Sequence, residues 1–181
     1  RYLLILTIFF TKYFQIMANC KSCGKSIGFF SSSKTCCRCG SKVCGDCAKV
    51  ADGTKYEYSL LYLSKLSEVD KSKFTFWAGN AYFCKSCWNN VSPKLYRMSA
   101  CTGNDVRTFT ANYQGRTPRG NKSRMYQTEF YKDRNDAFDE IKLVAEYLDS
   151  NAVVDINILR EVEEDDNYKY SVWAIEGKII L

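Results

Sequence analysis

Eight of the ten cysteines fall into four pairs that share a two-residue spacer. The pairs are Cys20 and Cys23, Cys36 and Cys39, Cys44 and Cys47, and Cys84 and Cys87. A CxxC turn presents two thiolates to one ion, and zinc takes four such ligands in a tetrahedron. The four pairs therefore predict two zinc ions. Because every ligand is a cysteine and no coordination position stays open, we expect both ions to be structural rather than catalytic.

Three glycines directly follow a ligand cysteine, namely Gly24, Gly40 and Gly45. A tight turn often needs a positive φ at this point, and glycine adopts it without steric cost. The alternative to metal is a disulfide framework, for which eight cysteines allow 105 connectivities. Disulfides inside four CxxC pairs of one short segment would close strained small rings. A reducing compartment also favours metal over disulfides, so the compartment matters.

The chain contains no histidine. This excludes catalytic triads and metal sites that need an imidazole, and it removes the side chain that most often transfers protons near neutral pH. We therefore expect a protein that is not an enzyme and has no small-molecule substrate. Its chemistry would be recognition, on a surface that the metal sites hold in shape.

An apolar segment, Tyr2–Phe10, opens the chain and resembles the core of a secretory signal, although it is too short to span a bilayer as a helix. No small-residue cleavage pattern precedes Cys20, and Met17 resembles an ordinary start. We expect residues 1–16 to lie outside the fold and the protein to be cytoplasmic. A signal or membrane-touching segment and a core strand are the alternatives.

The residues from Cys36 to Cys47 read CCRCGSKVCGDC, and residues 81–88 read AYFCKSCW. The first run resembles the centre of a FYVE zinc finger, whose pattern is CRxCGxxxCxxC, and the second resembles that family's closing VCDxCY motif. The resemblance covers residues 20–92 and implies a cross-braced module over residues 17–92. It assigns Cys20, Cys23, Cys44 and Cys47 to one zinc, and Cys36, Cys39, Cys84 and Cys87 to the other. Two sequential zinc ribbons remain an alternative pairing.

The FYVE family binds a phosphoinositide through an RRHHCR motif around the third ligand. Here the matching positions, residues 32–37, read SSKTCC, and only Lys34 is basic. A phosphate clamp needs several convergent cations. The resemblance therefore implies an adaptor that offers a surface to a protein partner or an anionic membrane lipid, through Lys34, Arg38 and Lys42. Phe29 and Phe30 are either an apolar tip for the membrane or, as we expect in preference, core residues of a short zinc-bound strand. A lipid ligand would place it peripherally at endosomal-type membranes.

Two other zinc-dependent functions remain as alternatives. A RING-like ubiquitin-ligase scaffold has its fifth ligand two or three residues after the fourth, whereas four residues separate Cys39 from Cys44 here. A zinc-ribbon nucleic-acid-binding protein would suit residues 20–134, where basic residues predominate. Residues 135–181 disfavour it, because they hold 12 Asp and Glu against 4 Lys and Arg. This change of charge along the chain indicates two modules.

The elements that must position the last cysteine pair lie in an insert over residues 48–83. Tyr56, Tyr58, Leu60 and Tyr62 alternate with other residues, as do Phe74 and Phe76. Alternation of this kind predicts a hairpin. After residue 92 we expect a linker over residues 93–104.

Residues 105–181 show the pattern of a second domain. Strands are predicted around Phe109–Tyr113, Met125–Lys132, Val154–Ile158 and Tyr168–Ile175. Between the second and third, a helix is predicted over Asp136–Asp149. The fold class is α+β: a small double-zinc module followed by a ββαββ domain, with one helix on an antiparallel sheet. Residues 151–154 and 174–177 faintly resemble a family of small bacterial α+β proteins labelled as heavy-metal-binding.

Three local features of this second domain bear on its surface. Asn135 or Asp133 is the expected cap of the helix, and its early acidic residues, Asp136, Asp139 and Glu140, suit the positive end of the helix dipole. A basic loop can meet phosphate, RNA or an acidic segment, and its cations are Arg116, Arg119, Lys122 and Arg124. An acidic run lacks the spacing of a calcium loop and predicts a solvated turn; it comprises Glu161, Glu163, Glu164, Asp165 and Asp166.

Overall fold

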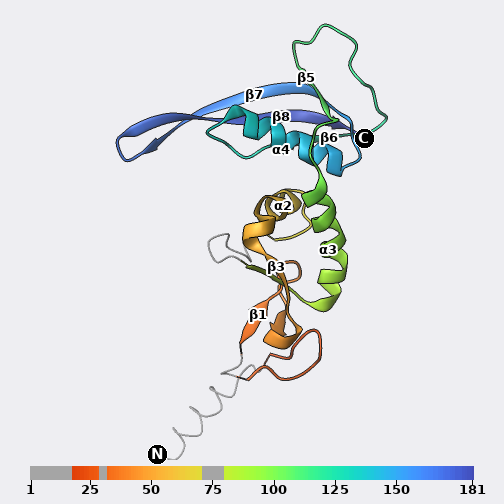
Figure 1. Ribbon diagram of the computed structural model, residues 1–181, viewed down its shortest axis with the longest axis vertical. Coiled ribbons are helices and arrows are strands. Elements are labelled where there is room, and N and C mark those ends of the chain that lie inside the picture. Colours follow the sequence, from red (N-terminus) through yellow and green to blue (C-terminus); the bar gives the residue numbers. More distant parts are fainter. Residues whose placement is uncertain (1–17, 29–31, 71–79) are drawn as a thin grey trace, which may run out of the picture. The chain divides into compact units, whose positions relative to one another are not determined.

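The computed structural model of the 181-residue chain describes residues 18–28, 32–70 and 80–181. The chain forms two compact units, Arg1–Tyr96 and Arg97–Leu181 (Figure 1). Both contain helices and small sheets, so the protein is mixed α and β. The apolar leader, the Phe29–Phe30 tip and the predicted strand around Phe74 and Phe76 lie outside the described residues.

Short elements build the N-terminal unit. β1 (Ser33–Thr35) pairs antiparallel with β2 (Lys42–Cys44), and β3 (Lys49–Asp52) pairs antiparallel with β4 (Asn80–Phe83). One 3-10 turn, η1 (Gly45–Cys47), follows β2. Among the described residues two helices follow these strands, α2 (Gly53–Lys65) after β3 and α3 (Lys85–Ala100) after β4, and α3 extends past Tyr96, where the unit ends. A few short strands bury little apolar surface, so the stability of such a unit depends on additional cross-links between its segments.

The prediction of a hairpin over residues 48–83 is wrong for its central part, because Gly53–Lys65 is the helix α2. The tyrosines alternate, but Leu60, Leu63 and Leu66 are spaced by three residues and all are buried. That spacing places them on one helical face. Tyr58, by contrast, is 62% exposed. The period of the buried leucines therefore decides the structure, and the alternation of the tyrosines does not.

Asp52, the last residue of β3, is the N-cap of helix α2. Its Oδ1 accepts hydrogen bonds from the backbone N–H groups of Thr54, at 2.9 Å, and of Lys55, at 3.2 Å. We expect Asp52→Ala to lower the free energy of unfolding of the zinc-loaded N-terminal unit by about 1 kcal/mol, because two N–H groups of the first turn lose their acceptor. Denaturant titration followed through the amide signals of α2 measures this. Asp52→Asn keeps an acceptor and is the matched control; equal stability of the Ala and Asn variants would contradict the assignment.

The linker predicted over residues 93–104 is helical as far as Ala100, as part of α3. Pro93 lies inside this helix, although a proline there removes one hydrogen bond and crowds the preceding turn. Val91, Leu95 and Met98 are nevertheless all buried and share one face of the helix. Their burial outweighs the cost of Pro93 and carries the helix beyond the metal-binding segment.

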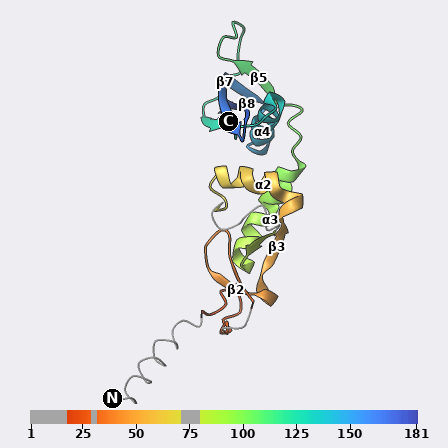
Figure 2. The same ribbon diagram turned by 90° about the vertical axis from the view of Figure 1, so that its left-hand side faces the viewer.

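The C-terminal unit contains a four-stranded sheet with helix α4 (Arg134–Tyr147) against it (Figure 1; Figure 2). The sheet order is β5-β7-β8-β6. The strands are β5 (Arg107–Thr110), β6 (Ser123–Gln127), β7 (Ala152–Asp165) and β8 (Tyr168–Ile180). The prediction of a wholly antiparallel sheet is wrong for one pair, because β5 runs parallel to β7. The long connection between them, through β6 and α4, permits that direction.

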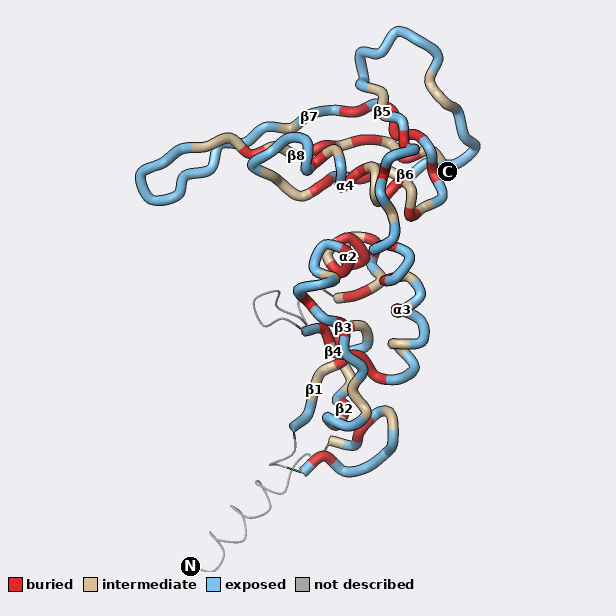
Figure 3. The backbone as a smooth tube through the Cα atoms, in the orientation of Figure 1, coloured by how far each residue is buried: buried red, intermediate tan, exposed pale blue. Residues whose placement is uncertain are grey.

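The core of this unit lies between α4 and the sheet, where buried stretches face each other (Figure 3). Gly177 of β8 allows the close approach of α4, since a Cβ there would come within 2.8 Å of Val153 Cγ1 and 3.2 Å of Ile141 Cδ1. Of the two predicted helix caps, Asp133 is the one used: its Oδ1 accepts from the Asn135 N–H at 2.8 Å.

Candidate metal centre

One group of sulfurs comes from the first and third cysteine pairs. The Sγ atoms of Cys20, Cys23, Cys44 and Cys47 all lie within 4.8 Å of one another, and those of Cys23 and Cys44 are 3.9 Å apart. Four sulfurs at 2.3 Å from a common centre would be separated by about 3.8 Å. The spacing of the sulfurs therefore fits a tetrahedral metal ion.

Backbone hydrogen bonds position the cysteines of this group. The Gly24 N–H donates to the Cys20 carbonyl at 2.8 Å and closes the first turn, with Gly24 at φ 72°. The Cys44 N–H, at the end of β2, donates to Cys20 Sγ at 3.4 Å. This hydrogen bond is the main cause that lowers the pKa of Cys20 to about 6. A thiolate is thus favoured where a cation would bind.

A second group comes from the second and fourth pairs. The Sγ atoms of Cys36, Cys39, Cys84 and Cys87 also lie within 4.8 Å of one another, and those of Cys39 and Cys84 are 3.9 Å apart. The turn between β1 and β2 supplies the first two, and the end of β4 and the first turn of α3 supply the others. Gly40 closes its turn as Gly24 does, with φ 73° and its N–H on the Cys36 carbonyl at 2.9 Å.

Two serines contact this second group and were not singled out from the sequence. Ser41 Oγ lies 3.3 Å from Cys39 Sγ, and Ser86 Oγ lies 3.4 Å from Cys84 Sγ. Burial raises the pKa of Cys39, but hydrogen bonds with the Ser41 side chain and backbone outweigh it and lower the value to about 6. Each serine stands two residues after a ligand cysteine. This spacing is the signal that sequence reasoning could have used.

The last cysteine of each group, Cys47 or Cys87, has a raised pKa instead of a lowered one. Hydrogen bonds with Cys44 and Cys23 raise the pKa of Cys47 to about 12, and burial raises the pKa of Cys87. Without a cation, four thiolates in one place would repel each other, so one sulfur keeps its proton. A divalent cation would remove this repulsion and release the proton.

The structure thus brings the Cys20/Cys23 pair together with Cys44/Cys47, and the Cys36/Cys39 pair together with Cys84/Cys87. This division is the one that the FYVE resemblance implies, and it differs from two sequential ribbons. Cys-only tetrahedral donors suit zinc. The two groups could hold two metal ions and are compatible with a zinc-finger-like module.

Gly45 and Cys37 serve the module in other ways. Gly45 has no positive φ; instead a Cβ there would come within 2.7 Å of Ser32 Oγ. Cys37 is buried, and its backbone N–H donates to the Tyr82 carbonyl while its own carbonyl accepts from the Asp70 N–H. The backbone at Cys37 therefore ties the second group to β4 and to the segment after α2.

The three predicted surface cations do not converge. Lys42 Nζ donates to Thr35 Oγ1 at 2.9 Å, across the β1–β2 pair. Lys34 directly precedes Thr35 in β1, so its side chain lies on the opposite face of the β1–β2 pair. Its Nζ lies 4.7 Å from the ring centroid of Tyr82. Arg38 lies 3.9 Å from a carboxylate oxygen of Glu68. The set therefore does not form one phosphate clamp.

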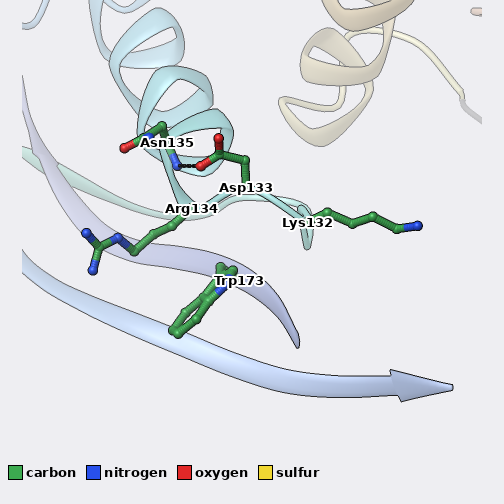
Figure 4. A pocket seen from close by; sticks show the side chains of 5 residues that line it. All are labelled: Lys132, Asp133, Arg134, Asn135 and Trp173. Carbon is green, nitrogen blue, oxygen red and sulfur yellow. Dashed lines mark hydrogen bonds between the residues drawn. The ribbon is translucent and has the colours of Figure 1, made fainter. Parts of the chain in front are cut away.

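A pocket of about 470 Å³ lies in the C-terminal unit, at the start of α4 (Figure 4). Its lining residues are Lys132, Asp133, Arg134, Asn135 and Trp173. Asp133 is already engaged as the helix cap. The pocket mixes both signs of charge, and it has no group of sulfurs or carboxylates that resembles the metal centres.

Comparisons with protein-family models, with curated protein sequences and with solved structures gave no match for this chain. The metal-binding interpretation therefore rests on the two cysteine groups themselves. Across residues 18–28, 32–70 and 80–181, no helix has the length and apolar character needed to cross a membrane.

Proposed function

We propose that this protein is a non-catalytic adaptor whose N-terminal unit is a FYVE-like scaffold held by two structural zinc ions. The main support for this proposal is that each cysteine group supplies four sulfurs at the spacing of a complete tetrahedron. An ion with four protein ligands has no position for substrate or water. Recognition by the surrounding surface is then the function that such a unit can perform.

The surface favours a protein partner, with an anionic membrane as a weaker ligand. Tyr58 and Tyr96 are exposed over half or more of their surface, and aromatic side chains are enriched at protein interfaces. Lys34 and Lys42 add positive charge, but they lie on opposite sides of the β1–β2 pair. Separated lysines attract an anionic surface without selecting one headgroup.

Vesicle flotation of the zinc-loaded chain tests the membrane part. We expect weak binding to phosphatidylserine vesicles, lost as salt is raised, because exposed charges are screened. Vesicles with phosphatidylinositol 3-phosphate at the same total charge should bind equally, within about twofold. Lys34→Ala/Lys42→Ala should weaken binding to both alike, with Lys49→Ala/Lys55→Ala as the matched control. A preference of tenfold or more for the phosphoinositide would show that the cations do form a specific pocket and would contradict this proposal.

A further inference from the structure

Two oppositely charged segments of the C-terminal unit remain without full partners. We define the basic loop as residues 115–124, which include the first two residues of β6 and contain Arg116, Arg119, Lys122 and Arg124. No acidic residue occurs between positions 106 and 128. Among the residues that the structure describes, none of these four cations forms an ion pair. The loop therefore carries four positive charges, and none of its residues is buried.

The second segment is the acidic ribbon tip, residues 161–166 at the turn between β7 and β8. All five of its carboxylates are exposed: Glu161, Glu163, Glu164, Asp165 and Asp166. Glu164 lies 3.5 Å from Lys169 Nζ, and Glu163 accepts from the Tyr170 hydroxyl at 2.9 Å. Within the described part of the chain the other three have no side-chain partner. The acidic run was predicted as a solvated turn, but residues as far as Asp165 belong to strand β7.

The fold keeps these two segments apart within one copy. β5 pairs with β7 only as far as Ile156, and β6 begins at Ser123 opposite Ile180. Beyond Ile156, β8 is the one strand among the described residues that pairs with β7, and the ribbon projects out of the sheet (Figure 1; Figure 3). The ten residues of strand from Ile156 to Asp165 are joined by nine steps and span about 30 Å. That is well beyond the screening length of about 8 Å at physiological salt, so the segments do not neutralise each other.

We propose that the basic loop of one copy binds the acidic ribbon tip of a second copy, head to tail. The loop's arginines can form paired hydrogen bonds with carboxylates, which makes them better partners than lysines. Each contact uses the loop of one copy and the tip of the other, so both copies keep one free segment. Such a head-to-tail contact joins copies into a closed ring or an open chain, according to the rotation between neighbouring copies.

A second copy fits this surface better than a nucleic acid does. A nucleic acid would satisfy the loop, but its phosphates would be repelled by the tip and by the acidic excess of residues 135–181. The ribbon tip of another copy satisfies both segments at once. This inference goes beyond the proposed adaptor function and does not depend on the zinc sites. It would join several partner-binding units in one assembly, which raises the overall affinity for a multivalent partner.

Sedimentation velocity of the full zinc-loaded chain tests the proposal. Because exposed ion pairs are individually weak, we expect the average mass to rise with concentration at low salt and to return to that of a monomer near 1 M salt, where the screening length is about 3 Å. A chain that stays monomeric at low salt, or associates equally at both salt concentrations, would overturn the proposal.

Charge-reversal variants identify the segments. Arg116→Glu/Arg119→Glu and Glu161→Lys/Asp165→Lys should each weaken self-association at least about tenfold, while an equimolar mixture of the two variants should associate again. Lys49→Glu/Lys55→Glu changes the net charge as much as the loop variant, but in the N-terminal unit, and should retain most of the association. Failure of the mixture to associate would refute the pairing. Unchanged association of the loop variant, together with loss of binding to single-stranded RNA, would assign the loop to nucleic acid instead.

Discussion

Removing metal from the zinc-loaded chain is expected to unfold the N-terminal unit and to leave the C-terminal unit folded. The described strands of the N-terminal unit are three or four residues long, and both cysteine groups join segments that are far apart in the chain. A structural zinc site contributes on the order of 10–16 kcal/mol in small peptides, which is comparable to the whole stability of a typical domain, about 5–15 kcal/mol. Amide signals from both units, recorded before and after chelation, measure the effect separately in each.

The number of zinc ions and of protected thiols per chain can be measured on the same samples. Before chelation we expect two zinc ions per chain and nine thiols protected from alkylation, eight by the metal ions and Cys37 by burial in the fold, with Cys101 outside the two groups. Cys84→Ser/Cys87→Ser should lose one ion and unfold the N-terminal unit, whereas Cys101→Ser should keep both ions. Persistence of the N-terminal amide signals after complete removal of metal would refute the structural role of the ions. Recovery of oxidised pairs instead of zinc would favour the disulfide alternative.

The cysteine groups were the part of the structure that spacing predicts best. A CxxC turn is local, so its two sulfurs must lie together whatever the rest of the chain does. Which turn meets which is a tertiary property, and only the resemblance to a known family suggested an answer. The arrangement of the three predicted surface cations is a tertiary property as well. Lys34 and Lys42 are close in sequence, but strand pairing places them on opposite sides, and Glu68 engages Arg38 from a distant segment.

The helices show where local patterns give conflicting signals. In α2 the tyrosines alternate while Leu60, Leu63 and Leu66 follow the helical period, and burial of the leucines prevails. In α4 the predicted helix is present, and Asp133 caps it as one of the two candidates expected. For Glu140, however, the sequence suggests only an acidic residue that suits the helix dipole. It is fully buried, because three hydrogen-bond donors from an earlier segment surround it, and the sequence near the helix does not reveal those donors.

The second large effect is expected at Glu140, in the core of the C-terminal unit. Its carboxylate accepts hydrogen bonds from the hydroxyls of Tyr126, at 2.6 Å, and Tyr131, at 2.8 Å, and from the backbone N–H of Glu129, at 2.9 Å. Glu140→Ala leaves these donors without their acceptor and opens a cavity beside them. We expect the free energy of unfolding of this unit to fall by about 3–5 kcal/mol. Denaturant titration followed through the amide signals of β7 and β8 measures it.

Two further variants separate the hydrogen bonds from the simple loss of a side chain on the helix. Glu140→Gln fills the same space and retains one acceptor oxygen, so its cost should be smaller, about 1–2 kcal/mol. Asp139→Ala removes a carboxylate from the neighbouring, exposed position of α4 and should change stability by less than about 0.5 kcal/mol. If Glu140→Ala cost no more than Asp139→Ala, the three hydrogen bonds would not contribute to stability, and the sheet would depend on apolar packing against α4 alone.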